Sequence, residues 1–195
     1  MSLKGTKTIE NLMKAFAGES QARNRYDFFA KVAKKEGFVQ ISNFFTETAL
    51  NEHEHAKVFY KHIAEKAEDL PATVHVDADY PIEYRTTYEN LKAAAAGENE
   101  ECTELYPKFA DIAEEEGFKD IANSFRQIAK VEKEHEKRYL KLAENIANGK
   151  VFKKDEKVYW KCNNCGYILE AFAAPEICPA CQHPKAHFEV LADNY

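Results

Sequence analysis

The chain contains an internal repeat, and each copy places polar residues where a protein core is expected. Around these residues, apolar side chains recur every three or four positions, which is the spacing of one buried face of an α-helix. Burial of an unpaired carboxylate costs several kcal/mol, so something positive must meet these residues. They are a lone glutamate and a Glu-x-x-His motif in each copy: Glu19, Glu52 and His55, then Glu98, Glu132 and His135.

The periodic segments predict four helices that pair as two hairpins. Gly37 and Gly117 follow the first and third segments and are typical of the glycines that end helices before short turns. The segment 69–84 has two prolines and no helical period, and it is long enough to run the length of a bundle. One long crossover between two hairpins predicts an all-α four-helix bundle with ferritin-like topology. The helices are expected over residues 9–33, 41–62, 88–112 and 121–146.

One extra residue lies inside the third predicted helix. The offset of the repeat is 79 residues at Glu19 and Glu98, but 80 residues at every later match. An insertion within a helix is often absorbed as a π-bulge, and such bulges favour functional sites. We therefore expect a π-bulge between Glu98 and Tyr106. Thr86-x-x-Glu89 resembles a capping box that opens this helix.

A lone glutamate from each of two helices and a Glu-x-x-His from each of the other two is the ligand set of a carboxylate-bridged di-metal site. The alternative is a buried polar network without metal. Glu101, three residues after Glu98, adds a ligand that the first copy lacks, because its counterpart is Ala22. Five glutamates and two histidines favour iron or manganese. Glu101 and His55 would face the same metal from opposite helices, so one can replace the other when the charge of the metal changes.

Two tyrosines, Tyr26 and Tyr106, lie one to two turns beyond the lone glutamates. A phenol at this place can donate a hydrogen bond to a metal-bound carboxylate or to peroxide. The alternative, that both are amphipathic core residues, stays open at this point.

A second metal site is expected in the tail. The bundle is predicted to cover residues 1–149, a polar linker residues 150–156, and a small domain residues 157–195. That domain is too small to fold without a metal. Its two Cys-x-x-Cys knuckles supply four thiolates, which bind either structural zinc or a single electron-carrying iron. The cysteines are Cys162, Cys165, Cys178 and Cys181.

Composition narrows the partners and the compartment. The net charge is −6 and no basic block is present, which argues against nucleic acid or an anionic membrane as a partner. No apolar run approaches membrane-spanning length, and the first residues lack the apolar core of a signal peptide. The cytoplasm is therefore the expected location. In a reducing compartment the Cys-x-x-Cys pairs indicate metal ligation rather than disulfides.

Along its whole length the sequence resembles the rubrerythrin family, and the tail resembles rubredoxin. One departure is Gln182, where stand-alone rubredoxins usually have a second glycine. The motifs that carry the resemblance are Ala17-Gly-Glu-Ser-Gln-Ala22, Asn51-Glu-His-Glu-His55, Ala96-Gly-Glu-Asn-Glu-Glu101, Glu132-Lys-Glu-His135, Cys162-Asn-Asn-Cys-Gly-Tyr167, Cys178-Pro-Ala-Cys181 and Cys181-Gln-His-Pro184.

The resemblance implies a non-haem di-iron peroxidase that defends against oxidative stress. It implies two irons in the bundle, a third on four cysteines, and reduction of hydrogen peroxide to water. By the same resemblance Glu52 and Glu132 bridge the irons, Glu19 and either Glu101 or His55 serve one iron, and Glu98 and His135 serve the other. Family members exchange Glu101 for His55 on reduction. They form homodimers and receive electrons from an external NAD(P)H-linked redox protein, for which this sequence has no dinucleotide-binding motif.

Two other functions are compatible with parts of the sequence. A ferritin-like bundle could oxidise and store iron, but storage does not require an attached tetrathiolate electron carrier. A zinc-ribbon interaction module on a structural metal bundle would need no enzymatic activity. The colour of ferric iron on four thiolates distinguishes iron from zinc in the tail.

Overall fold

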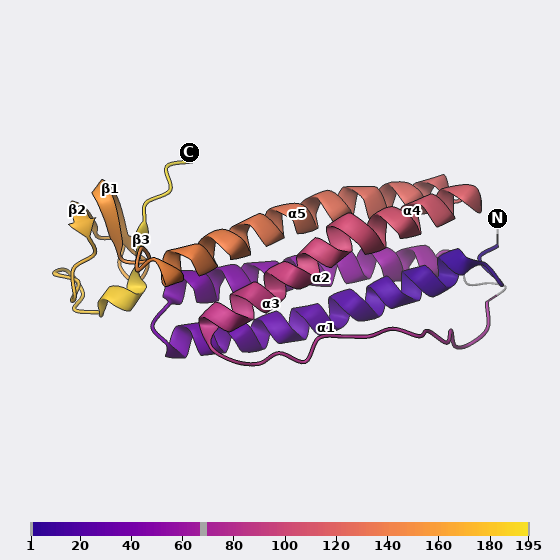
Figure 1. Cartoon of the computed structure of the whole chain (residues 1–195), viewed down its shortest axis with the longest axis horizontal. Coiled ribbons are helices and arrows are strands. Elements are labelled where there is room, and N and C mark those ends of the chain that lie inside the picture. The colour runs from indigo at the N-terminus through magenta and orange to yellow at the C-terminus, as the bar shows by residue number, and fades with distance from the viewer. Residues whose placement is uncertain (1, 67–69, 195) are drawn as a thin grey trace.

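A four-helix bundle and a small three-stranded module make up the computed structural model, which describes residues 2–66 and 70–194. The bundle is elongated, and the module lies at one end of it (Figure 1). The fold therefore has the predicted all-α bundle and the predicted small C-terminal metal domain. The bundle helices are α1 (Lys7–Lys35), α2 (Val39–Ala64), a third helix made of α3 (Thr87–Glu100) and α4 (Tyr106–Glu115), and α5 (Lys119–Ala147).

Short glycine turns join the helices of each hairpin, as predicted. Gly37 follows α1 with φ +85°, and Gly117 follows α4 with φ +89°. This left-handed backbone suits glycine, which has no Cβ to clash. At the first turn the Phe38 amide donates to the Ala33 carbonyl at 2.8 Å, which satisfies a carbonyl at the helix end. Both turns therefore reverse the chain within a few residues.

The second and third helices run in the same direction, because the connection between them travels back along the bundle beside α1 (Figure 1). Residues 71–86 of this crossover contain no helix or strand. Single side chains hold it: Tyr84 packs against Phe28 with 6.2 Å between ring centroids, and Leu70 and Val74 pack on the core. The predicted ferritin-like topology is confirmed.

The π-bulge is present where the extra residue was expected. A π-helical segment, η2 (Glu101–Leu105), separates α3 from α4. Pro107, which has no backbone N–H, follows directly after Tyr106 at the start of α4. The capping box is also present, since the Thr86 side chain accepts from the Glu89 amide and the Glu89 carboxylate accepts from the Thr86 amide.

Two apolar clusters fill the bundle, one on each side of a polar layer. The first contains Leu12 and Ala15 of α1, and the second begins with Ala22 and Tyr26 of the same helix. Glu19 lies between them and is fully buried. The polar residues of the repeat are thus enclosed by core on both sides.

The C-terminal module is an antiparallel sheet with strand order β2-β1-β3, closed around buried Trp160. Its elements are β1 (Lys153–Cys162), β2 (Ile168–Ala173), the 3₁₀ turn η3 (Lys185–His187) and β3 (Phe188–Val190). The first strand begins within the segment predicted as linker, residues 150–156. The domain limits therefore stay a prediction.

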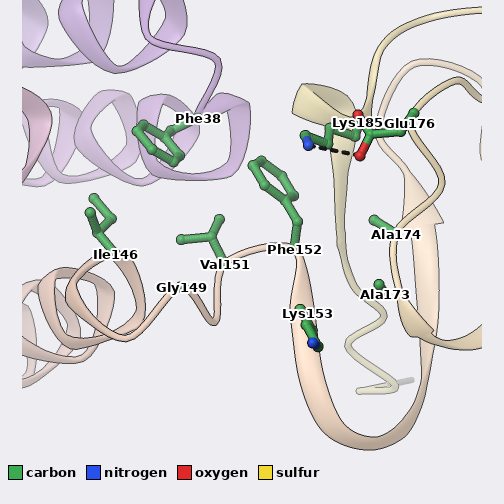
Figure 2. Close-up of a pocket in the computed structure, with 10 residues that line it drawn as sticks. All are labelled: Phe38, Ile146, Gly149, Val151, Phe152, Lys153, Ala173, Ala174, Glu176 and Lys185. Atoms are coloured by element: carbon green, nitrogen blue, oxygen red, sulfur yellow. Dashed lines mark hydrogen bonds and ion pairs between the residues drawn. The ribbon is translucent and has the colours of Figure 1, made fainter.

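The module rests on the end of the bundle. Phe152 stacks on Phe38 of the first turn, with 6.2 Å between ring centroids and 5° between ring planes. Figure 2 shows the pocket of about 410 Å³ beside this stack, bounded by Ile146 on one side and by the Lys185–Glu176 ion pair on the other. No helix among the described residues has both the length and the apolar character needed to cross a membrane.

Candidate metal centres

The repeat brings its six polar residues together in the middle of the bundle. Two groups of four side chains each have their ligand atoms within 4.8 Å of one another. Glu52 and Glu132 belong to both groups, so these two carboxylates lie between two neighbouring positions. The groups are Glu19, Glu52, His55 and Glu132, and Glu52, Glu98, Glu132 and His135.

Each histidine contacts the carboxylates of both Glu-x-x-His helices. His55 Nδ1 lies 2.8 Å from Glu52 Oε2 and 2.9 Å from Glu132 Oε1. His135 Nδ1 lies 2.8 Å from Glu132 Oε2 and 3.3 Å from Glu52 Oε1. Both side chains of each Glu-x-x-His motif therefore point toward one centre, as the spacing of three residues predicted.

The burial of these carboxylates tests whether a cation fits. All four glutamates of the two groups are at most 1% exposed. Five of their oxygens are buried and accept no hydrogen bond among the described residues: Glu19 Oε2, Glu52 Oε1, Glu98 Oε2, and both oxygens of Glu132. Orphaned carboxylate oxygens in a core require a positive partner. The residues fit a pair of metal ions.

The pKa values reflect the same crowding of charge. Burial raises the pKa of Glu19 well above its usual value and that of Glu98 to about 8, with nearby carboxylates adding to both shifts. Burial alone would lower the pKa of His55, but the Glu132 and Glu52 carboxylates beside it raise it to about 10. The same carboxylates raise the pKa of His135 to about 12. Without metal, protons supply the positive charge that the cluster needs.

Tyr26 and Tyr106, the two tyrosines that the sequence placed near the lone glutamates, both contact the cluster. Tyr26 is buried and donates a hydrogen bond to Glu98 Oε1 at 2.5 Å. Tyr106 is also buried and donates to Glu19 Oε1. Each lone glutamate thus has one oxygen held by a phenol and one oxygen free for another partner. This geometry favours the hydrogen-bonding interpretation over the alternative of plain core residues.

Glu101 lies outside both groups of four, whereas His55 belongs to one of them. The Glu101 carboxylate lines a pocket of about 320 Å³ next to Gly18 and Tyr80. It also lies near the cluster, because burial and the Glu98, Glu132 and Glu52 carboxylates raise its pKa well above the usual value. Tyr80 was not predicted from the sequence to be a functional residue. The crossover has no periodicity that would place its side chains, so no signal in the sequence could have found it.

The four cysteines of the tail form a compact cluster at one end of the module. The Sγ atoms of Cys162 and Cys181 are 3.8 Å apart, and those of Cys165 and Cys178 are 3.7 Å apart. Sulfurs that are roughly 2.3 Å from a tetrahedral metal lie about 3.8 Å from one another. The spacing fits a tetrathiolate metal and is too long for disulfides.

Backbone amides surround these thiols. A hydrogen bond from the His183 backbone lowers the pKa of Cys181 to about 6. Gly166, after the second cysteine, has φ +80°, and Gln182, after the fourth cysteine, has φ +60°. Gln182 therefore adopts the left-handed backbone that glycine supplies in the first knuckle. The departure from the usual rubredoxin sequence leaves the knuckle geometry intact.

The fold and its two clusters define a di-metal four-helix bundle protein with an attached tetrathiolate module. Comparison with known families agrees over both parts. The family model described as rubrerythrin matches residues 10–143, and the model described as the rubredoxin-like domain of rubrerythrin matches residues 160–189. The chain belongs to the rubrerythrin family. Its cofactors are accordingly two irons in the bundle and one iron on the four cysteines.

Individual relatives support the assignment over the full chain. Rubrerythrin-1 of Clostridium acetobutylicum is 61% identical over 194 residues, which cover 100% of this chain and 99% of that protein. A solved structure of nigerythrin in a partially reduced state is 32% identical, with a TM-score of 0.62, and covers 97% of this chain and 92% of that one. A bacterioferritin of Desulfovibrio desulfuricans shares the fold, with a TM-score of 0.65 at 23% identity over 74% of this chain and 82% of its own.

Proposed function

We propose that this protein reduces hydrogen peroxide to water in the bundle, with electrons that enter through the four-cysteine iron. One observation carries the proposal: an enclosed carboxylate–histidine cluster lies on the same chain as four cysteines with the spacing of a tetrathiolate metal site. Iron storage would use the first feature but has no need of the second. Hydrogen peroxide, two electrons and two protons give two molecules of water.

The proposed ligands follow from the two groups of side chains. Glu52 and Glu132, which belong to both groups, would bridge the irons. Glu19 and either His55 or Glu101 would hold one iron, and Glu98 and His135 the other. Cys162, Cys165, Cys178 and Cys181 would hold the third.

When bound, the bundle irons supply electrons for cleavage of the O–O bond, and the tail iron transfers electrons one at a time. The chain itself orients the ligands. Tyr26 and Tyr106 hold one oxygen of Glu98 and Glu19, respectively, and so fix the direction of the other oxygen. The aromatic core on both sides excludes bulk water from the cluster. These roles are part of the proposal.

Electron delivery favours a homodimer. From His135 to Ala147, α5 advances by twelve positions, which is about 18 Å at roughly 1.5 Å per residue, and the module begins only beyond this stretch. Within one chain the two sites are therefore far apart along the bundle. We propose that the tail iron of one subunit serves the bundle of a second copy. An external NAD(P)H-linked redox protein would reduce the tail iron in the cytoplasm.

A turnover experiment tests the proposal. Iron-loaded protein is reduced anaerobically with dithionite, freed of excess reductant and mixed with hydrogen peroxide. Rapid reoxidation with consumption of one peroxide per reduced bundle is the expected result. Ferrous protein that reacts with oxygen but not with peroxide would support the iron-oxidation function instead.

A further inference from the structure

The pocket beside Glu101 is built from three separate parts of the chain. Its walls come from one face of α1, the stretch from Gly97 to Phe109 that carries Glu101, and residues 77–81 of the crossover. Among the described residues, six of the seven proposed bundle ligands belong to the two ligand groups, and Glu101 is the one that does not. The crossover covers this residue. The pocket connects the surface of the bundle to this carboxylate.

Gly18 forms the floor between Glu101 and the crossover. A Cβ atom placed at Gly18 would lie 3.8 Å from Glu101 Oε1 and 4.0 Å from Tyr80 Cε1. These are ordinary van der Waals distances, so alanine would fit but would fill the space that the carboxylate faces. Glycine costs about 1 kcal/mol relative to alanine within a helix, and here it leaves that space open.

Tyr80 forms the outer wall of the pocket. Its hydroxyl donates a long hydrogen bond of 3.4 Å to the Lys14 carbonyl of α1, and the residue is 40% exposed. The surrounding crossover contains no helix or strand, so the position of this wall depends on the hydrogen bond to Lys14 and on the packing of the Tyr80 ring.

Arg25 supplies positive charge to the same pocket. It lies on α1, and its Nη1 is buried without a hydrogen-bond partner among the described residues. Burial and the carboxylates of Glu98, Glu132 and Glu52 raise the pKa of Glu101 well above its usual value, and the Arg25 guanidinium opposes this rise.

We infer that Tyr80 is a positioning residue for Glu101, and that the pocket it closes is the entrance for small polar reactants. The inference rests on the proposed function insofar as the reactant is peroxide. The Tyr80 ring bounds the space over Gly18 that the Glu101 carboxylate also faces, and it limits entry to molecules small enough to pass beside that carboxylate.

Azide is a suitable probe, because it is a small anion that binds ferric iron and changes its visible spectrum. We expect Tyr80→Ala to raise the association rate constant of azide with the oxidised bundle about tenfold, since the wall is removed. Tyr80→Phe keeps the ring and should stay within about twofold of the unmodified protein. Tyr84→Ala is the matched control, because Tyr84 is an exposed tyrosine of the same crossover that packs on Phe28 and does not line this pocket.

Two outcomes would overturn the inference. One is an unchanged azide rate in Tyr80→Ala with both bundle irons retained. The other is an equal acceleration in Tyr84→Ala, which would mean that any loosening of the crossover has the same effect. The exposure of Tyr80 makes it unlike a core residue, so the variant is expected to keep its fold and its iron.

A second pair of variants tests the floor independently. Gly18→Ala should lower the azide rate severalfold, because the new methyl group narrows the space between Glu101 and Tyr80. Gly97→Ala is the control. Gly97 is the counterpart of Gly18 in the repeat and lines the same pocket, but a Cβ atom added at Gly97 would meet nothing within 4 Å. Both changes favour the helix equally, so a lower rate in Gly18→Ala alone supports the inference, and equal rates contradict it.

These measurements use oxidised protein without turnover, so they separate the inference from the proposed function. Protein that fails to reduce peroxide but shows the expected azide rates would refute the proposed function and leave the role of Tyr80 standing. Peroxide reduction with azide rates that do not respond to Tyr80 would do the reverse.

Discussion

Tyr26 donates a hydrogen bond across the bundle to Glu98, with 2.5 Å between the phenol oxygen and Oε1. The tyrosine belongs to the first copy of the repeat and the glutamate to the second. The reverse pair, Tyr106 and Glu19, completes the exchange. Neither hairpin can therefore build the site alone, and an ordered site requires that the two hairpins dock.

The shared carboxylates lead to the first prediction. Glu132→Ala should abolish binding of both bundle irons while the tail iron remains, because Glu132 belongs to both ligand groups. Glu52→Ala should behave in the same way. Metal analysis per chain measures the result, and Glu134→Ala, an exposed glutamate of the same helix, is the control. Two bundle irons in either variant would show that the bridging assignment is wrong.

The second prediction separates the two sites. Cys162→Ser should remove the visible colour of the tail iron and electron entry from an external donor. The chemically reduced variant should still consume one equivalent of peroxide, since the proposed reaction takes place in the bundle. Cys102→Ser, at the cysteine outside the tail cluster, should keep both properties. Loss of peroxide reactivity in reduced Cys162→Ser would contradict this division.

The repeat explains why so much of the site could be predicted. Glu52 and His55 share a helix face because they are three residues apart. The helices of the two copies pack against each other because each has an apolar face that carries the glutamates and histidines. The extra residue before Tyr106 also predicted a π-helical segment, which lies at residues 101–105. Local periodicity therefore determined these features.

Long-range relationships without a period could not be predicted. The sequence places Glu101 on the same helix face as Glu98, but the π-helical turn and the pocket under the crossover decide where its carboxylate lies. Tyr80 lies in a segment without helix or strand, so only the folded chain shows that its ring reaches α1. The stack of Phe38 on Phe152 likewise joins two domains whose arrangement no motif encodes.

Gln182 leads to the third prediction. Its φ of +60° costs a non-glycine residue about 1 kcal/mol, while glycine adopts this backbone freely. Gln182→Gly should therefore stabilise the tail module by up to about 1 kcal/mol, less the entropy that glycine adds to the unfolded chain. Resistance of the tail iron to loss in denaturant measures the effect. Gly166→Gln, the reverse change in the first knuckle, should weaken the module.

The fourth prediction concerns pH and metal removal. The pKa of His55 is raised from 6.5 to about 10 in the folded chain, so the stability it contributes is full below about pH 6.5 and is lost as the pH rises through about 10. The pKa of Glu98, raised from 4.5 to about 8, has the same sign. The metal-free bundle should therefore unfold at a lower temperature as the pH rises over this window.

Thermal unfolding of chelator-treated protein, followed by far-ultraviolet circular dichroism, measures this dependence. Iron replaces the bound protons, so the iron-loaded protein should show a weaker dependence, and iron uptake should release protons. A metal-free protein that becomes more stable as the pH rises would show that the histidines are not held protonated by the cluster.

The last prediction is ligand exchange between Glu101 and His55. In the structure His55 belongs to the group that contains Glu19, and Glu101 faces the pocket beside Gly18. This arrangement is the one expected for the reduced protein. Ferrous ions carry less charge and tolerate fewer anionic ligands, so the neutral imidazole of His55 should replace the Glu101 carboxylate on reduction. On oxidation, Glu101 should move inward and His55 should withdraw.

Structures of one iron-loaded preparation in both redox states test the exchange. Glu101→Gln removes the charge but keeps the shape, so it should leave His55 bound in both states, and Glu104→Gln on the same π-helical turn is the control. The exchange also requires the space over Gly18, so Gly18→Ala should slow it without changing the two end states. Identical ligation before and after reduction would leave Glu101 as a static residue and would remove the reason for the open pocket beside it.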